Sequence, residues 1–127
     1  MQEQHLYEYA IIRVVPRVER EEFINVGVVI CHWKRHYLGC KIQLDSKKLL
    51  MLDPKADVEM IQLNLASFNK ICAGTTDGGN IASMDLASRF RWLTAVRSSI
   101  IQTSRPHAGS AEDLEKTLER LFDENVR

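Results

Sequence analysis

The chain has 127 residues, of which 45% are hydrophobic and 27% charged, and its 17 basic and 17 acidic side chains give a formal net charge of zero. This balance is typical of one soluble globular domain that needs no disulfide or metal to build its core, and it disfavours nucleic acid as a partner. The sequence has no signal-peptide pattern and no apolar run of the roughly 18 residues that cross a bilayer. We therefore expect a single cytoplasmic domain over residues 1–127, without membrane contact.

The first part of the chain predicts three strands. Residues 6–15 include aromatic and β-branched side chains at both odd and even positions. This pattern indicates a central strand covered on both faces. Pro16 ends this strand, because proline has no N–H to offer a ladder. Residues 25–32 and 37–44 predict two further strands, and the short connections favour an antiparallel meander.

The second part predicts mainly helices. The pair Asp53 and Pro54 is typical of a helix start, and an apolar stripe of period three to four follows it. Residues 83–95 predict another helix, residues 98–103 a short strand, and Ser110 the start of a final helix. The predicted order is β-β-β-α-α-β-α, an α+β fold whose antiparallel sheet of about four strands has its helices packed on one face. The other face of the sheet is then left for solvent, a partner or a ligand.

Three blocks of the chain carry a family resemblance. Residues 7–32 read YEYAIIRVVPRVEREEFINVGVVICH, with an aromatic strand, R-x-V-P, a glutamate-rich link and F-x-N-x-G-V-V. RFRWL and RSSIIQTS follow within residues 89–104, and LERLFDENV occupies residues 118–126. Together they resemble a bacterial family, the domain of unknown function 3037, over nearly the whole chain. The chain departs from the family pattern at SRPHAG, where Arg105 separates the serine from the proline.

The resemblance implies a stand-alone cytoplasmic bacterial domain that is often encoded beside a kinase of the HipA type. It implies no known reaction. The kinase as a partner follows from the family association alone, since nothing in the composition or spacing of this chain points to one.

Several polar side chains stand within otherwise apolar strands. Arg13 should find a carboxylate, carbonyl groups or a ligand, because an unpaired buried guanidinium is costly. It is interpreted either as one half of an ion pair with Glu21 or Glu22, or as an anion-binding arginine at a strand end. Asn25 and Gly27 are interpreted as structural residues that form a turn and a bulge.

A second polar group lies near residue 100. Arg97, Ser99 and Gln102 supply guanidinium, hydroxyl and amide groups suited to phosphate or carboxylate, with a solvated strand face as the alternative. Arg89 can join them from the preceding helix. His107 is the candidate for a catalytic base, although an exposed loop histidine without a positioned acid is the plainer interpretation. The cysteine and histidine spacing predicts no metal site, and no cofactor motif is present.

Two classes of function follow. The first is a binding or regulatory module that acts through a protein partner, for example the HipA-like kinase. The second is a small enzyme or a nucleotide-binding or phosphate-binding domain with an arginine-rich pocket for an anionic small molecule. The missing phosphate loop and nucleophile motif favour the first over catalysis. An enzyme or anion-binding domain requires Arg13, Arg97 and His107 in one pocket. A module that binds a protein partner requires an exposed apolar strip near the sheet edge or Trp92. The sequence leaves the oligomeric state open.

Overall fold

The computed structural model of the protein describes residues 5–34, 36–97 and 99–127. These residues form five α-helices and a five-stranded antiparallel sheet. The predicted α+β class is therefore confirmed.

The sheet is built around its first strand. β1 (His5–Val14) pairs on one side with β2 (Ile24–His32), which in turn pairs with the edge strand β3 (Tyr37–Ile42). On its other side β1 pairs with two short strands, β4 (Ile101–Thr103) along its C-terminal half and β5 (His107–Ala111) along its N-terminal half. β1 is thus the central strand that its apolar composition predicts. β5 is an addition to the predicted order, because it occupies a segment that the sequence suggests is a loop.

Aspartates begin the four longer helices. In each case the carboxylate accepts a backbone N–H of the first turn, which satisfies a donor that the helix itself cannot pair. These helices and their capping residues are α1 (Ser46–Leu52) with Asp45, α2 (Val58–Ala73) with Asp57, α4 (Leu86–Thr94) with Asp85, and α5 (Leu114–Asn125) with Asp113. The shorter elements are α3 (Gly79–Ala82) and the 3-10 turns η1 (Val18–Arg20) and η2 (Thr76–Gly78).

Two helix starts differ from the prediction. Asp53 ends α1 instead of beginning α2, and its carboxylate accepts the N–H of Lys55 at 3.0 Å in the turn between the two helices. Ser110 lies within β5, so the final helix is capped three residues later by Asp113 and begins at Leu114.

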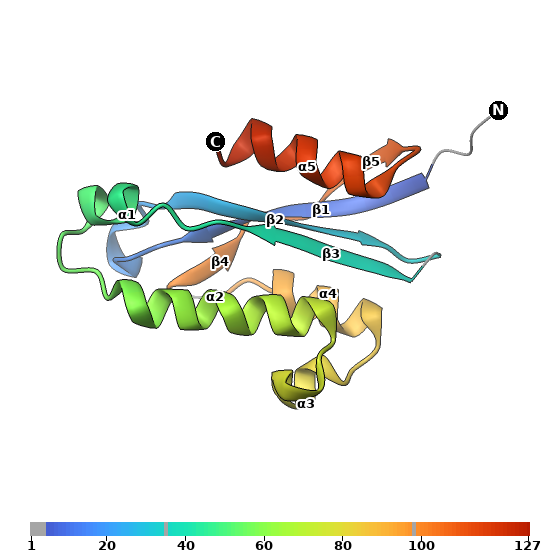
Figure 1. The fold of residues 1–127 in the computed structure, drawn as a ribbon, viewed down its shortest axis with the longest axis horizontal. Coiled ribbons are helices and arrows are strands. Elements are labelled where there is room, and N and C mark those ends of the chain that lie inside the picture. The colour runs from blue at the N-terminus through green and yellow to red at the C-terminus, as the bar shows by residue number, and fades with distance from the viewer. Residues whose placement is uncertain (1–4, 35, 98) are drawn as a thin grey trace.

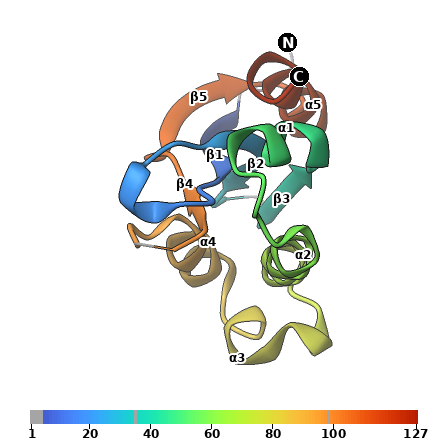
Figure 2. The same ribbon diagram turned by 90° about the vertical axis from the view of Figure 1, so that its left-hand side faces the viewer.

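Helices lie on both faces of the sheet rather than on one (Figures 1 and 2). α2 and α4 cover one face with a large core that includes Ile12 and Val29, and α5 covers the other with a smaller core that includes Ile11 and Val28. The physical reason is the apolar character of β1 and β2 at both parities, which leaves two faces to remove from water. The second face is therefore filled by the chain's own C-terminal helix, and it no longer calls for a partner or ligand.

Candidate functional site

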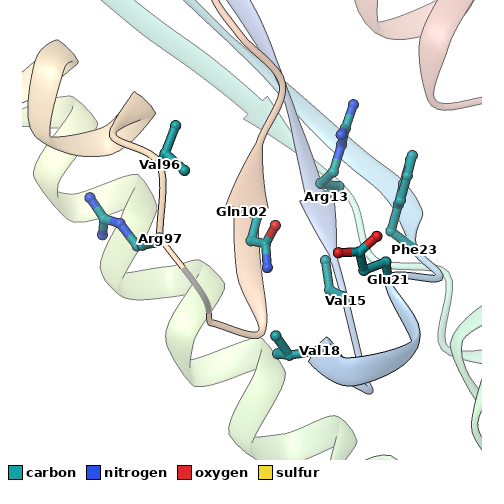
Figure 3. Close-up of a pocket in the computed structure, with 8 residues that line it drawn as sticks. All are labelled: Arg13, Val15, Val18, Glu21, Phe23, Val96, Arg97 and Gln102. Carbon is teal, nitrogen blue, oxygen red and sulfur yellow. The ribbon is translucent and has the colours of Figure 1, made fainter.

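A pocket of about 560 Å3 opens where β1 ends, beside β4 (Figure 3). Its lining comes from β1, the η1 link, β4 and the segment after α4. The lining residues are Arg13, Val15, Val18, Glu21, Phe23, Val96, Arg97 and Gln102. Two of the predicted anion-binding arginines therefore reach the same pocket.

A β-bulge shapes the strand pair beside this pocket. The register between β1 and β2 shifts between Ile12 and Arg13, which leaves Val26 as the extra residue. A Cβ on Gly27 would lie 2.5 Å from the backbone oxygen of Lys41, so only glycine lets β3 approach this closely. The bulge bends β2 at Val26, beside the end of β1 that carries Arg13.

Arg13 is held by an aromatic ring. Its guanidinium lies over the ring of Phe23, 4.1 Å from the centroid. Its Nε is buried and makes no hydrogen bond within the described residues, and burial lowers the pKa of Arg13. A cation–π contact with an aromatic ring therefore replaces the carboxylate partner that the sequence suggests.

The two glutamates of the link serve other purposes. The carboxylate of Glu22 pairs with Nε of Arg20 at 2.6 Å. Glu21 ends η1 with a left-handed backbone, φ 58°, and its side chain points across the pocket toward Gln102 (Figure 3). In the part of the chain that the structure describes, no ion pair joins Arg13 to either glutamate.

Asn25 fastens the C-terminal helix to the sheet. It stands opposite Arg13 across β1 and β2, and its Nδ2 donates to the carbonyl of Asn125 at the end of α5, at 3.0 Å. Its Oδ1 is buried and has no hydrogen-bond partner among the described atoms. The side chain therefore links the pocket region to α5.

Arg97 lies on the opposite wall of the pocket. Its guanidinium stacks 4.2 Å from the centroid of Trp92 and donates to the carbonyl of the same residue. Figure 3 shows that it points away from the other labelled side chains, while Arg13 points in another direction. The two guanidinium groups line one pocket without converging on a common point.

Ser99 and Gln102 hold the turn before β4. The hydroxyl of Ser99 donates to the carbonyl of Ile101 at 2.7 Å, and Nε2 of Gln102 donates to the carbonyl of Ser99 at 2.8 Å. Ser99 lines a separate pocket of about 260 Å3, which Trp92 and Arg97 also border. Each of these two side chains thus donates one hydrogen bond to the local backbone.

Arg89 completes the C-terminal end of α2. Its Nη1 donates to the carbonyls of Ile71 and Cys72, each at 3.2 Å. The last carbonyls of a helix have no partner within it and carry the negative end of its dipole, so a cation is stabilising there. Arg89 therefore lies outside the pocket that Arg13 and Arg97 line.

His107 is distant from Arg13. It is exposed on β5, opposite Tyr9, with ring centroids 5.4 Å apart. Tyr9 and Arg13 are four residues apart on β1, which corresponds to roughly 13 Å along a strand. The arrangement thus lacks the shared pocket that a catalytic role for His107 requires.

The two buried thiols, Cys31 and Cys72, are poorly suited to nucleophilic chemistry. Burial, with a smaller contribution from Glu8, raises the pKa of Cys31 to about 12. The pKa of Cys72 is raised by its hydrogen bond with Cys40 and by burial. Both thiols therefore remain protonated near neutral pH. Among the residues that the structure describes, no group of three or more His, Cys, Asp or Glu side chains is arranged to hold a metal ion, and no helix is long and apolar enough to cross a membrane.

Apolar side chains around the pocket are the part that sequence reasoning missed. Val96 is fully exposed, Phe23 is 44% exposed and Trp92 is 38% exposed. Of the three, only Trp92 stood out as a possible surface residue. The available signals were a phenylalanine at the end of the charged link VEREEF and a valine next to Arg97, outside any apolar stripe.

A protein-family model matches residues 9–126, and its description is "Protein of unknown function (DUF3037)". The chain belongs to this family. The match runs from within β1 to the end of α5, so every residue that lines the pocket lies inside the family domain. No curated protein and no solved structure matches the chain.

Proposed function

We propose that the protein is a binding module that docks onto a partner protein through the pocket face. This face is defined by Arg13, Phe23, Trp92, Val96 and Arg97. The observation that carries the proposal is the pair of arginine–aromatic stacks, Arg13 on Phe23 and Arg97 on Trp92, beside a pocket that a fully exposed valine also lines.

The chemistry of this face is that of a protein interface. Tryptophan, phenylalanine and arginine are enriched at the centres of interfaces, where a few such residues supply most of the binding free energy. Both arginines are already held against aromatic rings, so less side-chain entropy is lost when a partner binds. The exposed valine adds apolar area to that of the two aromatic rings. Exposed apolar side chains that cluster in this way are typical of an interaction site.

The same geometry gives less support to a small-ligand site or an enzyme. A bidentate anion site needs donors that converge, but the guanidinium groups of Arg13 and Arg97 point in different directions. Arg89 belongs to the end of α2, and His107 is roughly 13 Å along the sheet from Arg13. A general base also needs to reach the reacting group by a hydrogen bond or through one water molecule.

The partner's surface should be apolar with acidic groups at its margin. Two arginines and one glutamate line the pocket, so a carboxylate on the partner finds a cation on either wall. The family resemblance makes a HipA-like kinase in the bacterial cytoplasm our first candidate for this partner. The role of such a module is regulatory rather than catalytic.

The test is affinity purification of the tagged protein from its native host, with mass spectrometry of the proteins and small molecules that co-elute. Three proteins are compared: the wild type, Val96→Asp on the pocket face and Met84→Asp as a control at another exposed apolar position. Because both positions are exposed, we expect both variants to keep the wild-type thermal midpoint. We expect Val96→Asp to reduce a specific protein partner at least tenfold, and Met84→Asp to leave it unchanged.

A second comparison separates a protein partner from a small anion. Phe23→Ala should weaken binding of the purified partner, measured by calorimetry, because it removes both apolar area and the support for Arg13. Retention of the partner by folded Val96→Asp and Phe23→Ala would refute the proposed face. Loss of a co-eluting anionic small molecule in Arg13→Met, with no partner protein captured, would instead establish the ligand-binding alternative.

A further inference from the structure

A second groove, separate from the pocket face, lies between the edge strand β3 and α2. Its volume is about 480 Å3, and it shares no lining residue with the pocket beside β1. The lining residues are Cys40, Ile42, Leu44, Gln62, Leu65, Ala66 and Asn69. None of them is charged.

The outer edge of β3 has hydrogen-bonding groups to offer. In an antiparallel ladder every second residue directs its N–H and C=O toward the neighbouring strand. The N–H of Gln43 donates to the carbonyl of Val26 at 2.7 Å, and this sets Lys41 and Gly39 as the residues that face β2. The backbone groups of Leu38, Cys40 and Ile42 therefore point outward, and within the described residues no strand pairs with them.

α2 forms the far wall of the groove. Gln62, Leu65, Ala66 and Asn69 recur at helical spacing, so they form one stripe along the helix. The thiol of Cys40 donates to Oδ1 of Asn69 at 3.1 Å, which ties the strand to the helix at this point. The amides of Gln62 and Asn69 are exposed and offer further hydrogen bonds to a bound segment.

The usual protection of an edge strand is weak here. A lysine on an edge strand discourages pairing with another chain. In β3 the lysine is Lys41, but its ammonium group pairs with Glu119 and lies over the ring of Phe122, on the α5 face of the sheet. The groove side of the same strand therefore carries no charge against an incoming segment.

We propose that this groove binds an extended peptide segment of a partner, which adds to β3 as a further strand. The segment's backbone would pair with Leu38, Cys40 and Ile42, and every second side chain would enter the groove. Those side chains are uncharged, small or amide-bearing, because the uncharged lining offers no counter-charge to a desolvated ion. This site goes beyond the pocket face, because it recognises a backbone in strand conformation rather than a folded surface.

The experiment selects binders from a phage-displayed library of random octapeptides on the immobilised full-length protein. The strongest peptide is synthesised, and its affinity is measured by fluorescence anisotropy. It is then made again with one backbone nitrogen methylated at a time. We expect methylation to weaken binding at least tenfold at alternate positions only, since every second amide faces β3.

Variants of the protein locate the bound peptide. Cys40→Pro removes an outward N–H without breaking a hydrogen bond to β2, so the sheet should stay folded while binding falls at least tenfold. Cys40→Ser keeps the N–H and serves as its control. Ala66→Arg, on the exposed groove side of α2, should block binding, whereas Leu63→Arg, which lies outside the groove on the same helix, should not. Circular dichroism and thermal midpoints verify the fold of each variant.

Several outcomes would overturn the proposal. One is a peptide whose affinity is unchanged by Cys40→Pro and Ala66→Arg, or that tolerates methylation at every nitrogen. Another is failure to select any peptide that binds below millimolar concentration. A dimer seen by sedimentation, abolished by Cys40→Pro and without any selected peptide, would assign the edge to a second copy of the chain. Val96→Asp should leave peptide binding intact, which separates this test from that of the pocket face.

Discussion

Replacing Arg89 by methionine should destabilise the protein without affecting its binding. The substitution keeps most of the apolar stem but removes the donor to the carbonyls of Ile71 and Cys72, which lie 3.2 Å from Nη1. A hydrogen bond to a charged group contributes about 1.5–3 kcal/mol. We take this range for the pair together, because both contacts are long and share one nitrogen.

The lost free energy of unfolding corresponds to a shift in the thermal midpoint that calorimetry can resolve. The entropy of unfolding is roughly 2.1 cal/mol/K per residue, which gives about 0.27 kcal/mol/K for the 127 residues of this chain. The thermal midpoint of Arg89→Met should therefore fall by about 6–11 °C. Arg91→Met, on the same helix at an exposed arginine, should change the free energy of unfolding by less than about 0.5 kcal/mol.

Hydrogen exchange supplies an independent readout. Amides in the last turn of α2 should exchange faster in Arg89→Met than in the wild type, because that turn loses its external cap. A variant that keeps the wild-type midpoint and exchange rates but loses the captured partner would refute this reasoning. Arg89 would then belong to a binding face rather than to the end of α2.

Three further predictions concern the core, the bulge and the thiols. Phe122→Ala removes a fully buried ring from the α5 face and should cost about 3–5 kcal/mol in urea unfolding, and an unchanged midpoint would mean that α5 is not packed on the sheet. Gly27→Ala should cost about 1–3 kcal/mol, because its Cβ would meet the Lys41 oxygen at 2.5 Å, and a neutral result would contradict the close strand approach. The pKa of Cys31 rises from an ordinary 9.0 to about 12, so the folded state retains a proton that the unfolded state releases, and stability should be complete below pH 9 and fall as pH rises from 9 toward 12. Cys31→Ala should make this alkaline decline shallower, and an identical pH profile would show that the thiol is not buried as described.

Much of the fold is readable from local patterns. Apolar runs identify β1, β2 and β3, and the predicted starts of α2, α4 and α5 lie within a few residues of the observed ones. β5 was missed because its sequence, HAGSA, contains small residues with little intrinsic strand preference. It is a strand only because β1 offers a free edge there, and that information comes from the tertiary structure.

The coverage of the second sheet face shows a similar limit. The apolar character of β1 on both sides predicts correctly that both faces are covered. It does not identify what covers them, since a partner, a ligand and the chain's own final helix all satisfy the same pattern.

The candidate site was harder to predict than the fold. Arg13 stands out because a guanidinium is costly in an apolar strand, but its partner is Phe23 rather than a carboxylate. Their contact depends on the η1 turn and on the left-handed backbone of Glu21, neither of which has a clear sequence signal. Arg89 and Arg97 look like free cations in the sequence, yet each is bound to the end of a neighbouring helix.

The position of β1 has a consequence for biosynthesis. Its backbone N–H at Ile11 is bonded to the hydroxyl of Ser104, which is 93 positions later in the chain, and Asn25 is bonded to a carbonyl 100 positions later. A nascent chain therefore exposes one edge and one apolar side of β1 until residues 101–125 have left the ribosome. Until then the chain is partly folded and prone to aggregate through its exposed apolar surface. We therefore expect its folding during synthesis to benefit from a chaperone.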